Sequence, residues 1–267
     1  MTGKVIQEKH SDDSCHSKFE VDCNYDARFA SDVKSWIQFA VTKCVKDFKL
    51  YFRNSGDEDS YSIKNQSFYK CSHFTTLDIG YCLFQPKYVL AWKNLMKLTI
   101  SDSILEDDLI PNIVSGSPLL PTFVLRDCCA YVIRILSPSV KRLEIHGHEA
   151  DHLETLLEIV APYITDLYIS ESLWIENISL NNVSSVVKAY LNFKFPQLCY
   201  KVKKPYAELI LGEMIVDLQD AKEIEIGVRC YPILCRMAAK GYTLAPNVVG
   251  VDTSSMYYVD SDVDVSD

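Results

Sequence analysis

Residues 74–82 read FTTLDIGYC, and residues 95–103 repeat the same pattern as LMKLTISDS. Three later stretches share it: 120–128 (LPTFVLRDC), 140–148 (VKRLEIHGH) and 164–172 (ITDLYISES). In all five, apolar residues hold the first, fourth and sixth positions, and the ninth position is small, polar or a thiol except at His148. The fourth positions follow one another at steps of 21, 25, 20 and 24 residues, through Leu77, Leu98, Phe123, Leu143 and Leu167. One structural unit is therefore used repeatedly.

The fourth and sixth positions lie two residues apart on a strand, so both side chains point to the same face. The first position enters the same core from the preceding turn. A single repeat cannot bury that face alone, so repeats with this period stack and share a core, as in leucine-rich repeats. The pattern predicts an α/β leucine-rich-repeat solenoid of the ribonuclease-inhibitor type. We expect a curved parallel sheet on its concave face and helices and irregular segments on its convex face.

The ninth position marks the point where the chain leaves each strand. A small polar side chain there can bond backbone groups in the turn, and four of the five repeats carry one at Cys82, Ser103, Cys128 and Ser172. His148 departs from the pattern, which predicts a rearranged turn in that repeat.

The composition is that of an ordinary globular chain: 267 residues, 48% hydrophobic and 24% charged. A net charge of −9 argues against a broad surface for nucleic acid or anionic membrane, so we expect neither partner. No run of residues resembles a transmembrane span, and residues 1–27 are too polar for a signal peptide. Ten cysteines without a secretory signal indicate reduced side chains in a cytoplasmic or nuclear protein.

Three regions are expected along the chain. Residues 1–27 are a polar lead-in predicted to be disordered, 28–250 form the solenoid with a capping helix at each end, and 251–267 are an acidic disordered tail. Further strands are expected in a degenerate repeat at 45–52, at 185–193, and in a last repeat at 221–226. Helical spacing of apolar residues predicts helices within 28–45, 107–115, 149–160, 206–218 and 231–240.

The strand residues between the core positions must project from the concave face, where we expect a protein partner to bind. This set mixes both charge signs with tyrosine and hydroxyl groups, as protein-binding surfaces do. The alternative is a solvated sheet face without a partner. The candidate residues are Asp78, Tyr81, Lys97, Thr99, Asp102, Arg126, Asp127, Arg142, Glu144, His146, Asp166, Tyr168 and Glu171.

Catalytic and metal-binding patterns are weak. Cys128 and Cys129 are adjacent on a strand and point to opposite faces, so they are not read as a redox pair. Cys15, His16 and Cys23 lack the fourth ligand that zinc requires, and no third ligand lies near His146 and His148 in sequence. We find no Gly-x-Ser-x-Gly, no His-Glu-x-x-His and no phosphate-binding glycine loop. The sequence predicts no catalytic residue, no metal and no cofactor.

Several segments resemble plant F-box/leucine-rich-repeat proteins, and the resemblance covers roughly residues 25–245. They are DVKSWIQFAVTKCVKDFKLYF (32–52), FTTLDIGYCLF (74–84), WKNLMKLTISDSILEDDLI (92–110), GSPLLPTFVLRDC (116–128), SPSVKRLEIHG (137–147) and APYITDLYISE (161–171). In that family the repeats form a curved solenoid, and an N-terminal F-box docks onto the adaptor of a cullin ubiquitin ligase. The resemblance implies a substrate-binding repeat domain.

The chain departs from the family before its repeats. An F-box begins with a Leu-Pro-rich helical segment and is longer than residues 1–24, which contain no proline. We therefore expect no F-box here, and adaptor binding only in a longer product. Two hypotheses follow: a module that presents a protein for ubiquitination, or a competitor of intact relatives.

Two further segments have a functional and a simpler interpretation. Some members of the wider class bind an inositol phosphate or a small hormone, for which Lys201, Lys203 and Lys204 are candidates; a solvated loop is the alternative. Tyr257 and Tyr258 are read either as a short interaction motif or as a plain disordered terminus.

Overall fold

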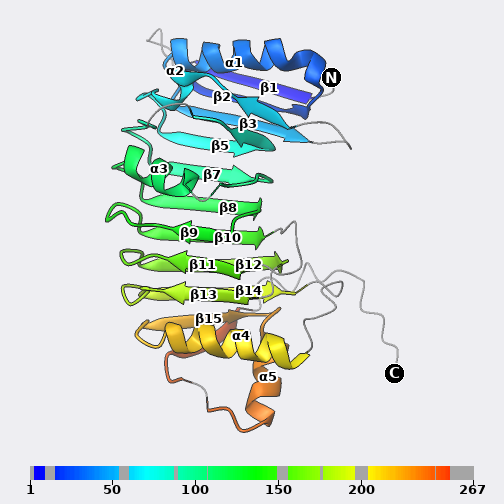
Figure 1. Cartoon of the computed structure of the whole chain (residues 1–267), viewed down its shortest axis with the longest axis vertical. Coiled ribbons are helices and arrows are strands. Elements are labelled where there is room, and N and C mark those ends of the chain that lie inside the picture. The colour runs from blue at the N-terminus through cyan, green and yellow to red at the C-terminus, as the bar shows by residue number, and fades with distance from the viewer. Residues whose placement is uncertain are drawn as a thin grey trace.

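The computed structural model describes residues 3–9, 16–53, 60–86, 90–106, 108–148, 156–174, 177–195, 204–243 and 245–252. Eleven strands form one large sheet, stacked along the long axis of the molecule (Figure 1). In spatial order they are β1 (Gly3–Lys9), β2 (His16–Asn24), β3 (Asp47–Arg53), β5 (Thr76–Gly80), β7 (Lys97–Ser101), β8 (Thr122–Cys128), β10 (Arg142–His148), β12 (Asp166–Leu173), β14 (Lys188–Lys194), β15 (Glu223–Gly227) and β16 (Val248–Asp252). Neighbouring strands are parallel except the antiparallel pair β1–β2.

The repeat positions stack in register across this sheet. The fourth-position residues Leu77, Leu98, Phe123, Leu143 and Leu167 pair in one row, and the sixth-position residues pair in the next. All ten side chains are at most 1% exposed, and the first-position residues are fully buried. Burying one such side chain stabilises a fold by about 1.5–3 kcal/mol. The leucine-rich-repeat solenoid predicted from the sequence is confirmed.

Each repeat leaves its strand through a left-handed residue at the eighth position. The φ angles are 53° at Tyr81, 49° at Asp102, 46° at Asp127, 79° at Gly147 and 70° at Glu171. This step turns the ninth side chain back toward the strand. Cys82 Sγ, Ser103 Oγ and Cys128 Sγ each donate to the carbonyl two residues earlier, at 3.4, 2.7 and 3.3 Å. The predicted backbone contact of the ninth position is confirmed in these three repeats.

His148 makes a different backbone contact from the other ninth-position residues, while its strand keeps regular register with β8. The pairing of β10 with β12 shifts register between His146 and His148, next to the left-handed Gly147. His148 is 2% exposed, and its Nε2 donates to the carbonyl of Ala130 at 2.7 Å. Burial holds the pKa of His148 below its ordinary value. The imidazole is thus a neutral part of the core.

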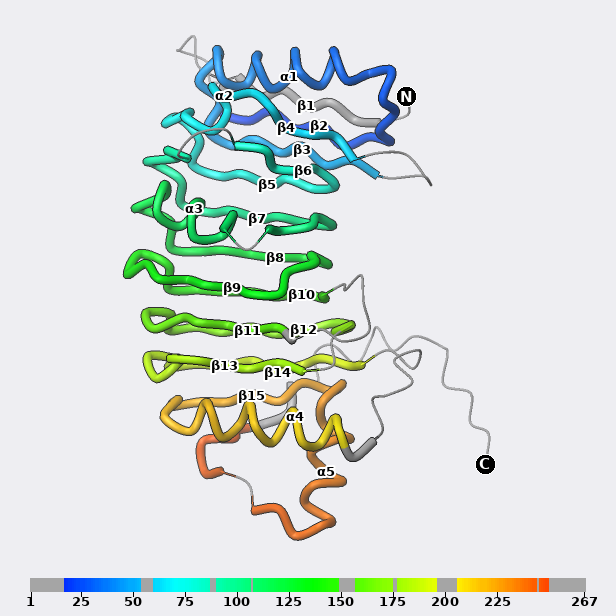
Figure 2. Tube along the Cα trace, in the orientation of Figure 1, coloured from blue at the N-terminus to red at the C-terminus, as the bar shows by residue number. Residues whose placement is uncertain are grey.

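A second layer closes the core from the other side. It contains α1 (Ala30–Thr42), α2 (Gln66–Tyr69), α3 (Leu109–Gly116), α4 (Lys204–Asp217) and the short strands β4 (Tyr61–Ile63), β6 (Cys82–Phe84), β9 (Val132–Arg134), β11 (Leu156–Val160) and β13 (Asn177–Asn181). β13, β11 and β9 form a small parallel sheet, and β4 pairs with β6. α1 lies near one end of the stack, and α4 with α5 (Tyr231–Ala239) lies at the other (Figures 1 and 2). A short 3₁₀ turn, Ala27–Phe29, precedes α1.

One predicted helix is a strand instead. The sequence predicts a helix over residues 149–160, but Leu156–Val160 is β11, and residues 149–155 lie outside the described residues. β11 pairs with β9 on one side and β13 on the other, and Leu157 and Ile159 are fully buried. Pairing on both edges favours the extended form of this short apolar run. The other four predicted helices are confirmed as α1, α3, α4 and α5.

The prediction of a disordered lead-in over 1–27 is wrong for the part described. β2 pairs with β3 along its length, and β1 pairs with β2. Phe19, Val21 and Cys23 alternate along β2 and are at most 3% exposed, because they extend the core beyond β3. The solenoid therefore starts before residue 28. At the other end, β16 reaches Asp252, and the predicted tail beyond it lies outside the described residues.

Within the described residues, no helix is long and apolar enough to cross a membrane.

Candidate protein-interaction face

The open face of the large sheet bears the side chains that alternate with the core positions. Strand register places nine predicted residues on it in rows that run across the repeats. They are Asp78, Lys97, Thr99, Arg126, Arg142, Glu144, His146, Asp166 and Tyr168. Tyr81, Asp102, Asp127 and Glu171 are the left-handed eighth-position residues at the carboxyl ends of the strands. Thr99 is only 6% exposed and offers little surface to a partner.

The first cluster on this face joins Tyr51 to Asp102. The Tyr51 hydroxyl donates to Asp102 Oδ2 at 3.1 Å, and its ring meets Tyr81 edge-on at 5.9 Å between centroids. The ring lies over Gly80, where an added Cβ would be 2.2 Å from Tyr51 Cδ2. Burial raises the pKa of Asp102, although hydrogen bonds from Tyr51 and Tyr81 act against that rise. Burial also raises the pKa of Tyr51 above its ordinary value.

Tyr51 was not among the predicted residues. Its strand belongs to the degenerate repeat, so the repeat motif did not mark its face. A usable signal was Gly80, because a glycine within a strand often marks a close approach by another group.

The second cluster connects β10 to β12. Arg142 Nε donates to Glu144 Oε1 at 2.5 Å, while its guanidinium stacks 4.0 Å from the centre of the Tyr168 ring. A second nitrogen of Arg142 donates to the Tyr168 hydroxyl at 3.2 Å. His146 bridges Glu144 Oε2, at 2.9 Å, and Ser170 Oγ, at 2.8 Å. Five neighbouring side chains thus hold one another in place.

The charge balance of this cluster centres on Glu144. Burial alone would raise the pKa of Glu144, but hydrogen bonds from His146 and Arg142 and the positive charge of Arg142 hold it below its ordinary value. Ser170, His146 and Glu144 are aligned in the order of a hydrolase triad. However, Ser170 is 5% exposed, so its hydroxyl offers little surface to a substrate carbonyl. The described contacts therefore form a rigid, hydrogen-bonded cluster.

A family comparison covers the strands that carry both clusters. The family model described as "FBD-associated F-box protein At5g56370, LRR repeats" matches residues 33–191, more than half of the chain. The chain belongs to this plant F-box/LRR-repeat family. No solved structure matches the chain significantly.

Named relatives from Arabidopsis thaliana agree with this family. Putative F-box/LRR-repeat protein At5g02930 is 27% identical over 76% of this chain and 44% of its own length. F-box protein At5g03100 is 27% identical over 80% of this chain and 68% of its own length. F-box/LRR-repeat protein At5g02910 is 30% identical over 73% of this chain and 42% of its own length. The chain thus spans less than half of two of these relatives.

The repeats of this family point to a protein-interaction module, and two cations lie on the open face of the sheet. Lys97 and Arg126 are exposed, and neither side chain makes a hydrogen bond or ion pair within the part of the chain that the structure describes.

The Asp127 carboxylate lies over Gly147, where an added Cβ would be 2.0 Å from its Oδ1. Burial, and next the negative charges of Asp102 and Glu171, raise the pKa of Asp127. Glu171 itself pairs with Arg229 at 3.0 Å.

The cysteine and histidine candidates take structural positions. Cys128 is 3% exposed and bonds the carbonyls of Ile100 and Arg126, and burial raises its pKa to about 12. His146 lies on the open face while His148 is in the core, so they do not share a ligand. No metal-binding group of three or more His, Cys, Asp or Glu occurs among the described residues. Cys15, Lys201, Lys203, Tyr257 and Tyr258 lie outside them.

Proposed function

We infer that the chain is a non-catalytic recognition module that binds another protein through the open face of its large sheet. The observation that carries this inference is the cluster of Arg142, Glu144, His146, Tyr168 and Ser170. Arginine and tyrosine are the residue types that most often dominate binding energy at protein interfaces. Here they are held in position before a partner arrives, which lowers the entropy cost of binding.

The unpaired cations beside this cluster add a second feature of an interface. Arg126 on β8 pairs in register with His146 of the cluster, and Lys97 lies one strand further away, on β7, on the same face. An acidic group on the partner would find a counter-charge there without breaking an existing ion pair. Such complementarity chiefly sets the partner and the association rate.

The direct test replaces Arg126, Arg142 and Tyr168 together by alanine. We expect this variant to lose capture of the partner from plant extract while keeping the melting temperature of a folded chain. The matched control replaces Lys93, Arg134 and Tyr163, which are exposed but outside the open face. Equal capture by both variants would show that the partner binds elsewhere.

A ubiquitin-ligase role is the finer part of the proposal. The relatives are named as F-box proteins, and a substrate-binding repeat domain in them would present its bound protein for ubiquitination. The transcript upstream of Met1 tests this role: an in-frame F-box segment would support it, together with capture of the ligase adaptor by the longer product. A competitor of intact relatives would capture the same protein without the adaptor.

Either role places the protein in the cytoplasm or nucleus, which a fluorescent fusion would test.

A further inference from the structure

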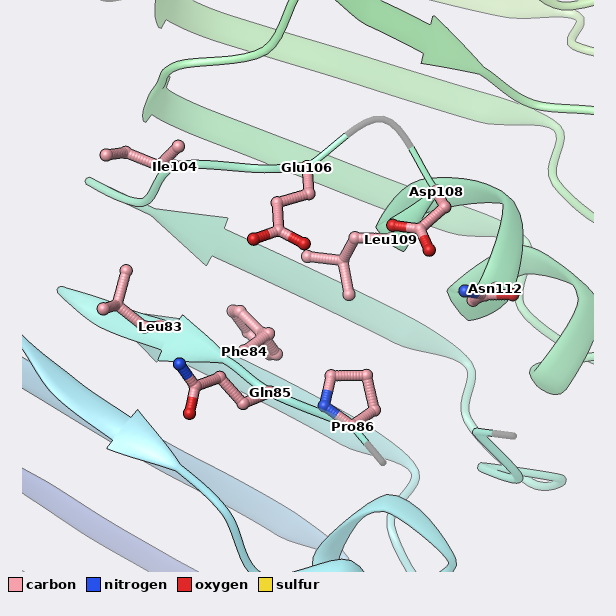
Figure 3. A pocket seen from close by; sticks show the side chains of 9 residues that line it. All are labelled: Leu83, Phe84, Gln85, Pro86, Ile104, Glu106, Asp108, Leu109 and Asn112. Atoms are coloured by element: carbon pink, nitrogen blue, oxygen red, sulfur yellow. The ribbon is translucent and has the colours of Figure 1, made fainter. Parts of the chain in front are cut away.

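A pocket lies between β6 and α3 in the second layer, with a volume of about 330 Å³ (Figure 3). The end of β6 and the residues after it form one wall, the segment after β7 forms another, and the first turn of α3 closes the third. The volume is at the small end of the range for ligand pockets, about 300–1,000 Å³. Its lining residues are Leu83, Phe84, Gln85, Pro86, Ile104, Glu106, Asp108, Leu109 and Asn112.

The pocket arises where the second layer changes its structure. β4 and β6 form a two-stranded sheet, and β9 begins the separate sheet with β11 and β13. Between these sheets the repeat returns through α3, which contacts β9. A helix cannot continue the hydrogen-bonded ladder from β6, so a gap remains at this junction.

Backbone hydrogen bonds hold the walls of the gap. The buried Tyr69 hydroxyl donates to the carbonyl of Ile63 at 2.7 Å and accepts from the backbone N–H of Gln85 at 2.9 Å. On the opposite wall, the N–H of Leu105 donates to the carbonyl of Cys129 at 2.9 Å. The backbone around the pocket is therefore ordered before a ligand binds, which lowers the entropy cost of binding.

The lining combines apolar walls with negative charge at the rim. Leu83, Phe84 and Leu109 line the interior, and Ile104 extends the apolar wall outward with 52% of its surface exposed. The carboxylates of Glu106 and Asp108 make no hydrogen bond or ion pair within the described residues. None of the lining residues that the structure describes is a lysine, arginine or histidine.

We propose that this pocket binds an arginine side chain presented by a basic segment of a partner protein. The aliphatic stem of arginine would pack on Ile104 and Leu83, as such stems do on apolar surfaces. Its planar guanidinium would lie between Glu106 and Asp108, with five N–H donors for two carboxylates. The amide oxygens of Gln85 and Asn112 are further acceptors.

The helix end beside the pocket does not reverse this preference. α3 begins at Leu109, and the amino end of a helix carries about half a positive charge. Two carboxylates outweigh that charge, so the described part of the rim is negative. This site uses residues of the second layer and does not depend on partner binding at the open face.

The test is a titration of the whole chain, with methyl groups of Leu83, Ile104 and Leu109 observed by NMR. The probe is the peptide acetyl-Ala-Arg-Ala-amide, and the matched probe carries citrulline, which has the size of arginine but no charge. We expect saturable methyl shifts with arginine and binding at least about fivefold weaker with citrulline. Equal binding of the two peptides, or no shift at millimolar arginine peptide, would overturn the proposal.

Two pairs of substitutions test whether the arginine peptide binds in this pocket. Glu106→Gln with Asp108→Asn removes both charges and keeps the side-chain shapes, and should weaken arginine binding by about fivefold or more. Glu213→Gln with Asp220→Asn makes the same charge change on exposed residues of α4 and the turn after it, and should leave binding unchanged. Unchanged methyl spectra away from the pocket would show that both variants are folded. Unchanged binding in the first variant would refute the site.

Discussion

The Tyr51 hydroxyl reaches over Gly80 and donates a hydrogen bond to Asp102, 3.1 Å away. Tyr51 lies on β3, and Asp102 follows β7, so the contact bridges the strand between them. It joins residues 51 positions apart in sequence. Three successive repeats are therefore tied together on the open face as well as through the core.

We predict from this contact that Gly80→Ala destabilises the fold, although the added methyl group does not clash with the core. The new Cβ would lie 2.2 Å from Tyr51 Cδ2, so the ring must move and its hydrogen bond to Asp102 is lost. We expect a loss of about 1–3 kcal/mol in the free energy of unfolding, measured by urea denaturation. In a Tyr51→Ala background the same substitution should cost much less, because the obstructing ring is absent. Equal costs in the two backgrounds would contradict the contact.

Leu143→Asp should unfold the middle of the solenoid. Leu143 is fully buried and pairs with Phe123 and Leu167 in the core row, so a carboxylate there has no partner. We expect loss of the cooperative thermal transition in circular dichroism. Thr122→Asp, on the open face of the neighbouring strand, is the control and should melt close to the parent. A parent-like melt of Leu143→Asp would show that the register is wrong.

Removal of residues 1–24 should lower the melting temperature, because β2 covers the edge of β3. Phe19, Val21 and Cys23 would leave the core, and Phe48, Leu50 and Phe52 would be exposed at a new sheet edge. Removal of residues 253–267 is the control and should change the melting temperature little. If both deletions melt like the parent, the first strands do not contribute to the fold.

Asp127→Asn should stabilise the chain at pH 7 and lose this effect in acid. The folded pKa of Asp127 lies above its unfolded value, so the folded chain binds the proton more tightly. The parent therefore gains stability as pH falls through that folded pKa, and the gain is complete below the unfolded value. Asparagine is neutral throughout and tolerates the left-handed φ of 46°.

Melting temperatures at pH 7 and at about pH 3, below the ordinary carboxyl pKa, measure this effect. The difference between Asp127→Asn and the parent should be positive at pH 7 and smaller in acid. Asp220→Asn serves as the control for removal of one negative charge elsewhere. A difference that is the same at both pH values would contradict the raised pKa.

Sequence patterns identified the repeats well and the connections less well. The rows through Leu77 and Ile79 follow from the motif because each position contacts its equivalent in the next repeat. β11 was predicted as a helix because Leu156, Leu157 and Val160 also fit helical spacing; pairing with β9 and β13 decided the outcome. β2 was missed because its short alternation lies among polar residues.

The open face of the large sheet was also predicted only in part. Spacing alone placed Arg142, Glu144 and Tyr168 on one side of the sheet, since strand residues two apart share a face. It could not show that Arg142 stacks on Tyr168, because that depends on rotamers of side chains in different repeats. It also could not show how these side chains bond one another.

The amino-acid sequence by itself determined the solenoid, the register of its core and the set of side chains between the core positions, because these depend on a local pattern that recurs at near-constant steps. Only the tertiary structure decided that Tyr51 reaches Asp102 and that Glu106 and Asp108 share a pocket with Leu83. These contacts join repeats through side chains that do not recur. Their geometry follows from how unequal connections pack between regular strands.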